Sequence, residues 1–322
     1  MNDEPRTCVR IADDLLAAAM GESEPRATQR VERHVAACAA CRRQFHEYRA
    51  VDAAVIALRE GPDPSPAAAL ARERMETRLA DLRQRLLRYR IFPSPLGNIL
   101  VARSELGISL VEYLERGNSV RASRLRNEPG VEAVEGGEDL EAVYRELLEY
   151  LDGRRRRLEW PLDLRLARSD FHRTVLRATA AIPYGAVIPY AGIANEIGKA
   201  SASRAVAQAL RWNPLPIVIP CHRVVGTSGA LTGYAGSKLG LKQRLLSIEG
   251  VPTGRETGAP FIRPQAMYVR YPGDREYCVP TCPSLETRHP MPLTRFASRD
   301  RAEAAGLSPC ATCRPDLHPL SR

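Results

Sequence analysis

Cys221 is the residue of this sequence whose neighbours best suit nucleophilic chemistry. It stands directly before His222, after the apolar run 216–219 and before the glycine-bearing segment 226–229. The thiolate is the reactive form of cysteine, and a nearby imidazole raises its population at neutral pH. The alternative is a buried, inert cysteine, which is the usual state of an isolated one. The apolar run predicts a buried strand that ends at Cys221.

The other cysteines lie in two groups towards the ends of the chain. The C-terminal group has the spacing Cys-x3-Cys and then, after a longer gap, Cys-x2-Cys. Four thiolates in such a pattern are a ligand set for tetrahedral zinc. In a reducing compartment a metal site is favoured over disulfides. The members of the group are Cys278, Cys282, Cys310 and Cys313.

The N-terminal group adds a histidine to its cysteines, in the pattern His34-x3-Cys38-x2-Cys41. His34 and Cys38 would lie one turn apart on the same face of a helix, and Cys41 would follow at the next turn. Zinc needs a fourth ligand, and Cys8 is the only unassigned cysteine that could supply it. His46 could compete as a ligand but stands outside the pattern. The sequence thus predicts two zinc sites, one in each terminal module.

Length and charge limit the class of protein. The chain has 322 residues, a net charge of +9 and a pI near 9.3, and its length suggests two or three domains. A basic balance fits a polyanionic partner, nucleic acid above all, although an arginine-rich composition can serve solubility alone. The start of the chain has no signal-peptide pattern, and no apolar run approaches the roughly 18 residues of a membrane span. We therefore expect a cytoplasmic protein without a membrane partner.

Helices dominate the start of the chain, and strands follow them. Alanine-rich helical segments are expected up to about residue 58, followed by a proline-rich linker at 61–66. A helix from about 67 to 88 would lead into a β-hairpin. The hairpin strands are 89–92 and 99–102, a third strand is 108–111, and a helix covers 138–151.

The segment before Cys221 has the outline of a helix-turn-helix. Gly198 would end the second helix, and Ser201 or Ser203 would cap the third. By shape alone an ordinary helical hairpin is the better-supported alternative. The expected helices span 171–181, 189–197 and a stretch from residue 201 or 203 to 212.

Ordered motifs from Ile182 to Gly250 resemble the O6-alkylguanine-DNA alkyltransferase family, the methylated-DNA–protein-cysteine methyltransferases. A weaker likeness extends back to about Tyr89. The resemblance implies a small αβ subdomain, a helical subdomain with a helix-turn-helix, and no organic cofactor. The motifs are Ile182-Pro183-Tyr184-Gly185, Tyr190, Ser203-Arg204-Ala205-Val206, Asn213-Pro214, the run 219–225, the run 229–236, and Lys242 to Gly250.

The same resemblance implies a role for each residue of the site. Cys221 would attack the alkyl carbon of a guanine flipped out of double-stranded DNA, and His222 would take the thiol proton through a water. Glu249 would hold the imidazole, and Tyr190 would donate to guanine N3 as charge develops on the base. Asn213 would pin the turn that leads to the nucleophile.

A second set of residues would contact the DNA. The resemblance implies that Arg204 inserts into the base stack and that Tyr234, Ala235 and Gly236 line the lid over the base. Arg211, at the end of the same helix as Arg204, is a further candidate for DNA contact. Because the helix-turn-helix of this family enters the minor groove, binding would depend on phosphates and shape more than on sequence.

Two positions depart from the family pattern. Trp212 stands where glycine is common before the Asn-Pro pair, and Ser237 replaces the second glycine of the lid. Both bear on DNA contact and substrate range rather than on the chemistry at Cys221.

The terminal modules resemble two further families. The C-terminal cysteines and the residues around them are similar to the zinc domain of the bacterial adaptive-response protein Ada. That likeness implies Cys278 as an acceptor of methyl groups from phosphotriesters. The arrangement of Cys8, His34, Cys38 and Cys41 resembles the zinc-binding anti-sigma domain, which implies a sigma factor as a protein partner.

The sequence therefore predicts a multidomain α+β protein that repairs O6-alkylguanine, with O4-alkylthymine as a second candidate substrate, through irreversible single-turnover alkyl transfer to Cys221. The alternative is a transcriptional regulator that responds to alkylation or oxidation through its zinc modules. The expected parts are a helical zinc module (1–60), a linker and helix (61–88), the αβ subdomain (89–165), the catalytic subdomain (166–250), a linker (251–265) and a four-cysteine zinc module (266–322).

Overall fold

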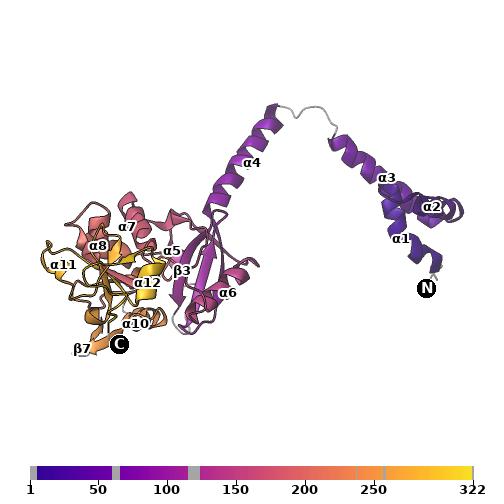
Figure 1. Ribbon diagram of the computed structural model, residues 1–322. Helices are drawn as coiled ribbons and strands as arrows, with labels where there is room; N and C mark the ends of the chain where they lie inside the picture. Colours follow the sequence, from indigo (N-terminus) through magenta and orange to yellow (C-terminus); the bar gives the residue numbers. More distant parts are fainter. Residues whose placement is uncertain (1–5, 60–65, 115–123, 237, 257–258, 321–322) are drawn as a thin grey trace. The chain divides into compact units, whose positions relative to one another are not determined.

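A computed structural model describes residues 6–59, 66–114, 124–236, 238–256 and 259–320 of the chain. The chain divides into two compact units, residues 1–79 and 80–322, and helix α4 (Pro66–Arg85) crosses the division. Figure 1 shows the order of the elements along the chain. No helix in these described ranges has the length and apolar composition that a membrane span requires.

The first unit is helical, which confirms the helices expected up to residue 58. It contains α1 (Arg6–Ala19), α2 (Pro25–Ala37) and α3 (Ala39–Arg59). Their contact buries Ile11, Leu15, Val31 and Cys41, which is a small core. Of the linker expected at 61–66, residues 61–65 lie outside the described ranges, and Pro66 is already the first residue of α4.

The second unit opens with a four-stranded sheet of order β3-β2-β1-β4. The predicted hairpin is confirmed: β1 (Leu86–Phe92) pairs antiparallel with β2 (Asn98–Arg103), which pairs antiparallel with β3 (Ile108–Leu114). The sequence did not indicate β4 (Glu132–Glu135), a short strand parallel to β1, nor α5 (Arg124–Asn127) before it. Helix α6 (Leu140–Leu151) follows, close to the expected range.

The helical part that follows carries the expected helix-turn-helix outline. A short 3-10 helix (Leu164–Leu166) precedes α7 (Asp170–Ala180), whose N-cap is Ser169. Gly198 lies just beyond α8 with φ of +70°, a conformation that favours glycine at a helix end. The expected serine cap of the next helix is wrong, since the N-cap of α9 is Ala202 and no side chain caps it. The remaining helices are α8 (Tyr190–Glu196), α9 (Ser203–Arg211) and α10 (Leu239–Ile248).

The strand expected to end at Cys221 is not formed. Residues 214–219 make a turn, and Cys221 begins a 3-10 helix, Cys221–Arg223. Ile217 has φ of +75°, which no strand accommodates, and the prolines of this run lack the N–H that a central strand must donate. The strands at this place are instead β5 (Ala186–Pro189) and β6 (Val224–Val225), which pair in parallel.

The segment 251–265 is not the linker that its prolines and glycines suggested. It forms a hairpin of β7 (Thr253–Glu256) and β8 (Ala259–Ile262), followed by a 3-10 helix (Pro264–Ala266). Val251 and Ile262 are buried together with Val187 of β5 and Leu246 of α10. Apolar residues at these positions anchor the hairpin to the catalytic subdomain, so composition alone misled the prediction.

The C-terminal module shares a sheet with the catalytic subdomain. Its strand β11 (Thr294–Phe296) pairs antiparallel with β5 and with β9 (Tyr268–Arg270), giving the order β6-β5-β11-β9. The module is therefore continuous with the catalytic subdomain rather than tethered to it. Its other elements are β10 (Glu276–Tyr277), α11 (Pro283–Glu286), α12 (Arg299–Ala304) and β12 (Ser308–Pro309).

Candidate active site and metal clusters

A turn held by the Asn213 side chain presents Cys221. The Nδ2 group of Asn213 donates to the carbonyl of Ile219 at 2.8 Å and to Sγ of Cys221 at 3.2 Å. Its Oδ1 accepts from the backbone N–H of Leu215 at 2.9 Å. One buried amide thus bridges both ends of the turn and reaches the thiol.

The Cys221 thiol is neutral in the resting protein. Burial raises the pKa of Cys221, because a thiolate would lose its hydration, while the Asn213 amide and the Lys242 ammonium oppose that shift. The residue is only 7% exposed. A reactive thiolate must therefore be produced at the time of reaction by a neighbouring base.

His222 has the protonation pattern of such a base. Its Nε2 lies 2.6 Å from Oε1 of Glu249, and both side chains are fully buried. An ionised carboxylate can only accept hydrogen bonds, so Nε2 carries the proton and Nδ1 keeps its lone pair. Nδ1 is buried and has no hydrogen-bond partner within the described part of the chain. Burial lowers the pKa of His222, with Glu249 opposing, so the imidazole is neutral at pH 7.

Glu249 is held as an anion by an arginine and by further donors. Burial alone would raise the pKa of Glu249, but Arg223 and His222 outweigh burial and hold it well below its usual range. The Arg223 Nε group donates to both carboxylate oxygens, at 3.1 and 2.9 Å. The Tyr150 hydroxyl donates to Oε1 at 2.5 Å, and the backbone N–H of Gly185 donates to Oε2 at 3.0 Å. This dense donor set is what a buried charge requires.

Sequence reasoning assigned no role to Tyr150 or to the Arg223 side chain. Tyr150 belongs to α6, far along the chain from Glu249, so no local spacing connects the two. Arg223 follows His222 in the same motif, and that adjacency was the one available signal for its part in the site.

Lys242 is a third functional residue that sequence reasoning left without a role. Its ammonium is buried and donates to the carbonyls of Val224 at 2.5 Å and Thr232 at 3.0 Å. Burial lowers the pKa of Lys242 to about 8. The ammonium joins the strand after the nucleophile to the lid loop, and its charge favours the Cys221 thiolate.

Two cavities meet at Cys221. One of about 570 Å³ is lined by Tyr190, Arg211, Tyr234, Ala235 and Gly236 together with Cys221, and so contains most of the expected pocket residues. A second, of about 290 Å³, shares Arg211, Cys221, Ala235 and Gly236 with the first. Their volumes are in the range of small-molecule sites, so a single nucleobase can be accommodated.

Tyr190 and Tyr234 form walls of the larger cavity. Tyr190 is half-buried, and its hydroxyl donates to the carbonyl of Thr232 at 3.2 Å. The Tyr234 hydroxyl lies 2.8 Å from that of Tyr113, and its ring stands edge-on to the His222 imidazole with centroids 6.3 Å apart. Tyr234 therefore supports the imidazole as well as the cavity wall.

Arg204 stands apart from these groups. It is exposed on α9, the second helix of the helix-turn-helix pair, and lines neither cavity. The structure thus gathers the expected residues of the pocket and leaves Arg204 on the outer surface, from which it can reach a partner molecule.

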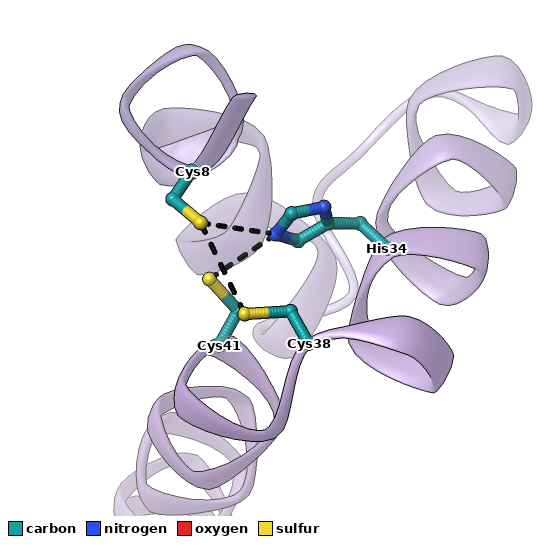
Figure 2. Close-up of side chains that lie close together, drawn as sticks. All are labelled: Cys8, His34, Cys38 and Cys41. Carbon is teal, nitrogen blue, oxygen red and sulfur yellow. Dashed lines mark hydrogen bonds between the residues drawn. The ribbon is translucent and has the colours of Figure 1, made fainter. Parts of the chain in front are cut away.

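The four N-terminal candidate ligands converge at the junction of α1, α2 and α3 (Figure 2). Cys8 Sγ lies 3.6 Å from His34 Nε2 and 3.9 Å from Cys38 Sγ, and His34 Nε2 lies 3.3 Å from Cys41 Sγ. The expected continuous helix is interrupted: Cys38 is extended, between the end of α2 and the start of α3. Three sulfurs and one imidazole nitrogen at this spacing fit the donor set of a tetrahedral metal ion.

The C-terminal candidate ligands form a second cluster. Donor atoms of Cys278, Cys282, Cys310 and Cys313 all lie within 4.8 Å of one another, and the first three residues are buried. All four are free thiols. Four converging thiols without a disulfide match the chemistry of a structural metal site, so this cluster too could hold a metal ion.

Comparison with known proteins identifies the part of the second unit between residues 87 and 251. Residues 170–251 match the family model "6-O-methylguanine DNA methyltransferase, DNA binding domain", and residues 87–164 match the model of its ribonuclease-like domain. A methylated-DNA–protein-cysteine methyltransferase of Methanosarcina acetivorans is 38% identical over 164 residues, which cover 50% of this chain and 97% of the relative.

Two further proteins are similar to this chain. The constitutive enzyme of Bacillus subtilis is 36% identical over 168 residues, covering 51% of this chain and 95% of that protein. Among solved structures, the O6-methylguanine methyltransferase of Mycobacterium tuberculosis is 33% identical, with a TM-score of 0.43, and the match covers 51% of this chain and 92% of that one. The chain belongs to the methylated-DNA–protein-cysteine methyltransferase family, whose members repair alkylated DNA by taking the alkyl group onto a cysteine of their own.

Proposed function

We propose that Cys221 is the acceptor of the alkyl group and that the substrate is O6-alkylguanine in double-stranded DNA. The observation that carries the proposal is the buried pair of His222 and Glu249, in which His222 directly follows the buried Cys221 and its Nδ1 has no partner among the described residues. A base with a free lone pair beside a neutral thiol is the arrangement that activates a nucleophile on demand.

The alkyl transfer is a single displacement in which atoms and electrons balance. The proton of the Cys221 thiol passes to Nδ1 of His222, through a water if the two do not touch directly. Sulfur bonds to the alkyl carbon as the bond between that carbon and O6 breaks, and the electron pair of the broken bond remains with guanine. Glu249 stabilises the imidazolium that results, Arg223 keeps Glu249 ionised, and the Tyr190 hydroxyl turns from Thr232 to donate to the leaving base.

The product explains why the protein would act once. A thioether on Cys221 is a poor leaving group, and no second cysteine lines the two cavities in the described part of the chain. The alkylated base must leave the duplex to reach a thiol that is 7% exposed. Arg204 on the outer surface of α9 is suited to fill the space that the base vacates, and Arg211 to contact the backbone.

Peptide mass spectrometry tests the proposal. The protein is incubated with a duplex that carries O6-methylguanine, and we expect a methyl group on the peptide that contains Cys221. The Cys221→Ser variant should bind the duplex and remain unmodified. Methyl transfer to another residue would refute the assignment. The absence of methyl transfer in a sample in which the duplex is bound would refute it as well.

We further propose zinc as the metal of both clusters, on the strength of their donor sets. Bound zinc would hold the thiolates deprotonated and link distant segments of chain. Elemental analysis of the full-length protein should give two zinc ions per chain, with one lost in Cys38→Ser and the other in Cys310→Ser. Methyl acceptance by Cys278 stays a prediction from the resemblance. A sigma factor as partner of the N-terminal module stays a prediction from the resemblance.

A further inference from the structure

Trp212 is the one exposed aromatic residue of this chain. Every phenylalanine, tyrosine and tryptophan lies in the described ranges, and only Trp212, 38% exposed, falls in the exposed class. It follows the last residue of α9 as the C-cap of that helix. A large aromatic left in water at the end of a DNA-facing helix suggests a contact made only in a complex.

Three arginines surround the Trp212 indole. The guanidinium carbon of Arg168 lies 3.6 Å from a ring centroid, that of Arg124 5.7 Å and that of Arg211 6.0 Å. Arg124 also donates to the Trp212 carbonyl at 3.4 Å, which fixes the backbone of this residue. Arg168 and Arg211 are exposed, and neither forms an ion pair with a carboxylate of the described residues. The indole is therefore bordered by two guanidinium groups that are available to an anion from a partner.

This surface adjoins the reactive thiol. Trp212, Arg124 and Arg211 line the 290 Å³ cavity that also contains Cys221, and Arg211 lines the larger cavity as well. A strand that delivers a nucleotide to Cys221 must pass close to them. An aromatic ring bordered by arginines binds unstacked bases by stacking, and the arginines bind the phosphates that join those bases by charge.

The geometry points to Trp212 and Arg168 as a stacking platform for the nucleobase next to the flipped one. Through this platform the protein binds unpaired DNA outside its reaction pocket. The inference rests on the proposed function, because it takes DNA as the partner. It adds a second point of contact on the damaged strand, with indole stacking on a base and Arg168 neutralising a neighbouring phosphate. Intact duplex offers no unstacked base and would engage the arginine alone.

Fluorescence gives a direct readout of the platform. The chain has two tryptophans, so Trp160→Phe leaves Trp212 as the only one. We expect a short oligothymidylate, and a duplex with O6-methylguanine, to quench the emission of this variant, and unmodified duplex to quench it much less. Unchanged emission with oligothymidylate at concentrations that saturate binding would overturn the inference.

Salt titrations separate stacking from charge. In the otherwise native chain, Trp212→Ala should weaken oligothymidylate binding about 5- to 150-fold without changing the dependence on salt concentration, and Trp212→Phe should retain most of the affinity. Arg168→Gln should lower the salt slope by about 0.7, the share of one single-strand phosphate. Arg173→Gln is the matched control, because Arg173 lies in the first turn of α7, shortly after Arg168, but pairs with Asp170 at 2.5 Å.

The outcomes distinguish this inference from the proposed function. If Trp212→Ala binds oligothymidylate as tightly as the native chain, or loses salt dependence along with affinity, the platform is refuted while methyl transfer to Cys221 can still be intact. If the native chain transfers no methyl group but Trp212 is quenched, the assignment of Cys221 fails and the DNA contact stands.

Discussion

The two cysteine clusters have similar ligands but very different surroundings. The N-terminal cluster sits in the unit of residues 1–79 beside a core of a few side chains, among them Ile11, Leu15 and Val31. The C-terminal cluster belongs to the same compact unit as the reactive thiol. Its module contributes β11, which pairs with β5 of the catalytic subdomain.

Packing continues from the C-terminal module into the catalytic network. The Arg301 guanidinium of α12 lies 4.5 Å from the ring centroid of Tyr184, and that ring packs edge-on against Tyr150 at 5.7 Å. Tyr150 in turn donates to Glu249. Similar donor sets therefore do not imply equal roles. The C-terminal cluster lies in the unit that contains the catalytic network, whereas the N-terminal cluster lies among its own helices. Effects on methyl transfer should therefore differ widely.

The largest effect is expected from removing a C-terminal ligand. Cys310→Ser should release the metal and destabilise the catalytic unit by at least about 3 kcal/mol, because a structural metal contributes its binding energy to folding. Methyl transfer should be abolished near physiological temperature. Thermal unfolding of the variant, followed together with transfer of a radiolabelled methyl group, measures both. A native melting temperature together with full methyl transfer would contradict the proposed difference between the two clusters.

Glu249→Gln is the reference variant with which Cys310→Ser is compared. It leaves Arg223 buried without its counter-charge, which costs about 3–5 kcal/mol of folding free energy. The imidazolium formed during transfer loses its stabilisation, so the single-turnover rate should fall by roughly 10²- to 10⁴-fold. Urea unfolding and quenched-flow kinetics give the two values. A rate within threefold of native, in a protein that is folded, would remove Glu249 from the mechanism.

Acidification should act on the same catalytic network. The folded pKa of His222 lies below 6.5 and that of Glu249 below 4.5, so both groups hold fewer protons when folded than when unfolded. Their contribution to stability is complete above pH 6.5, and protonation removes it as the pH falls towards and through the folded pKa values. Transfer should decline over the same range as His222 Nδ1 is protonated. A rate that stays flat at every pH at which the protein remains folded would argue against His222 as the base.

Arg301→Ala probes the contact between the C-terminal module and the catalytic network. Loss of the cation–π contact with Tyr184 should cost about 1 kcal/mol of stability and lower the transfer rate about two- to fivefold. Arg299→Ala is the control, since Arg299 lies on the same helix and pairs with Glu303 at 3.4 Å on the surface. Equal effects of the two variants would show that α12 matters only as a helix and not through Arg301.

The smallest effect on transfer is expected from the N-terminal cluster. Cys38→Ser should unfold helices of residues 6–59, visible as lost helical circular dichroism, yet leave the transfer rate within about twofold, because the catalytic network belongs to the other compact unit. His46→Ala, an exposed histidine outside the cluster, should change neither. A large loss of transfer in Cys38→Ser would show that the two units depend on each other and would overturn the comparison.

Local patterns predicted the parts of the fold that depend on local forces. The hairpin of β1 and β2, the helix boundary at Gly198 and the convergence of both cysteine sets follow from turn residues and ligand spacing. The prediction failed where distant contacts decide. The run before Cys221 looked like a strand by hydrophobicity, but Asn213 holds it as a turn. The segment 251–265 looked like a linker by composition, but burial of Ile262 makes it a hairpin.

The sequence by itself singled out Cys221, His222 and both sets of candidate metal ligands, because residue types and their spacing along the chain carry that information. Only the tertiary structure decided what surrounds them. Tyr150, Lys242 and β11 come from distant parts of the chain and meet the motif through sheet pairing and burial. Burial and long-range contacts are properties of the folded whole. Burial keeps the thiol neutral, Arg223 and His222 keep the Glu249 carboxylate ionised, and pairing of β11 with β5 makes the C-terminal module a part of the catalytic unit.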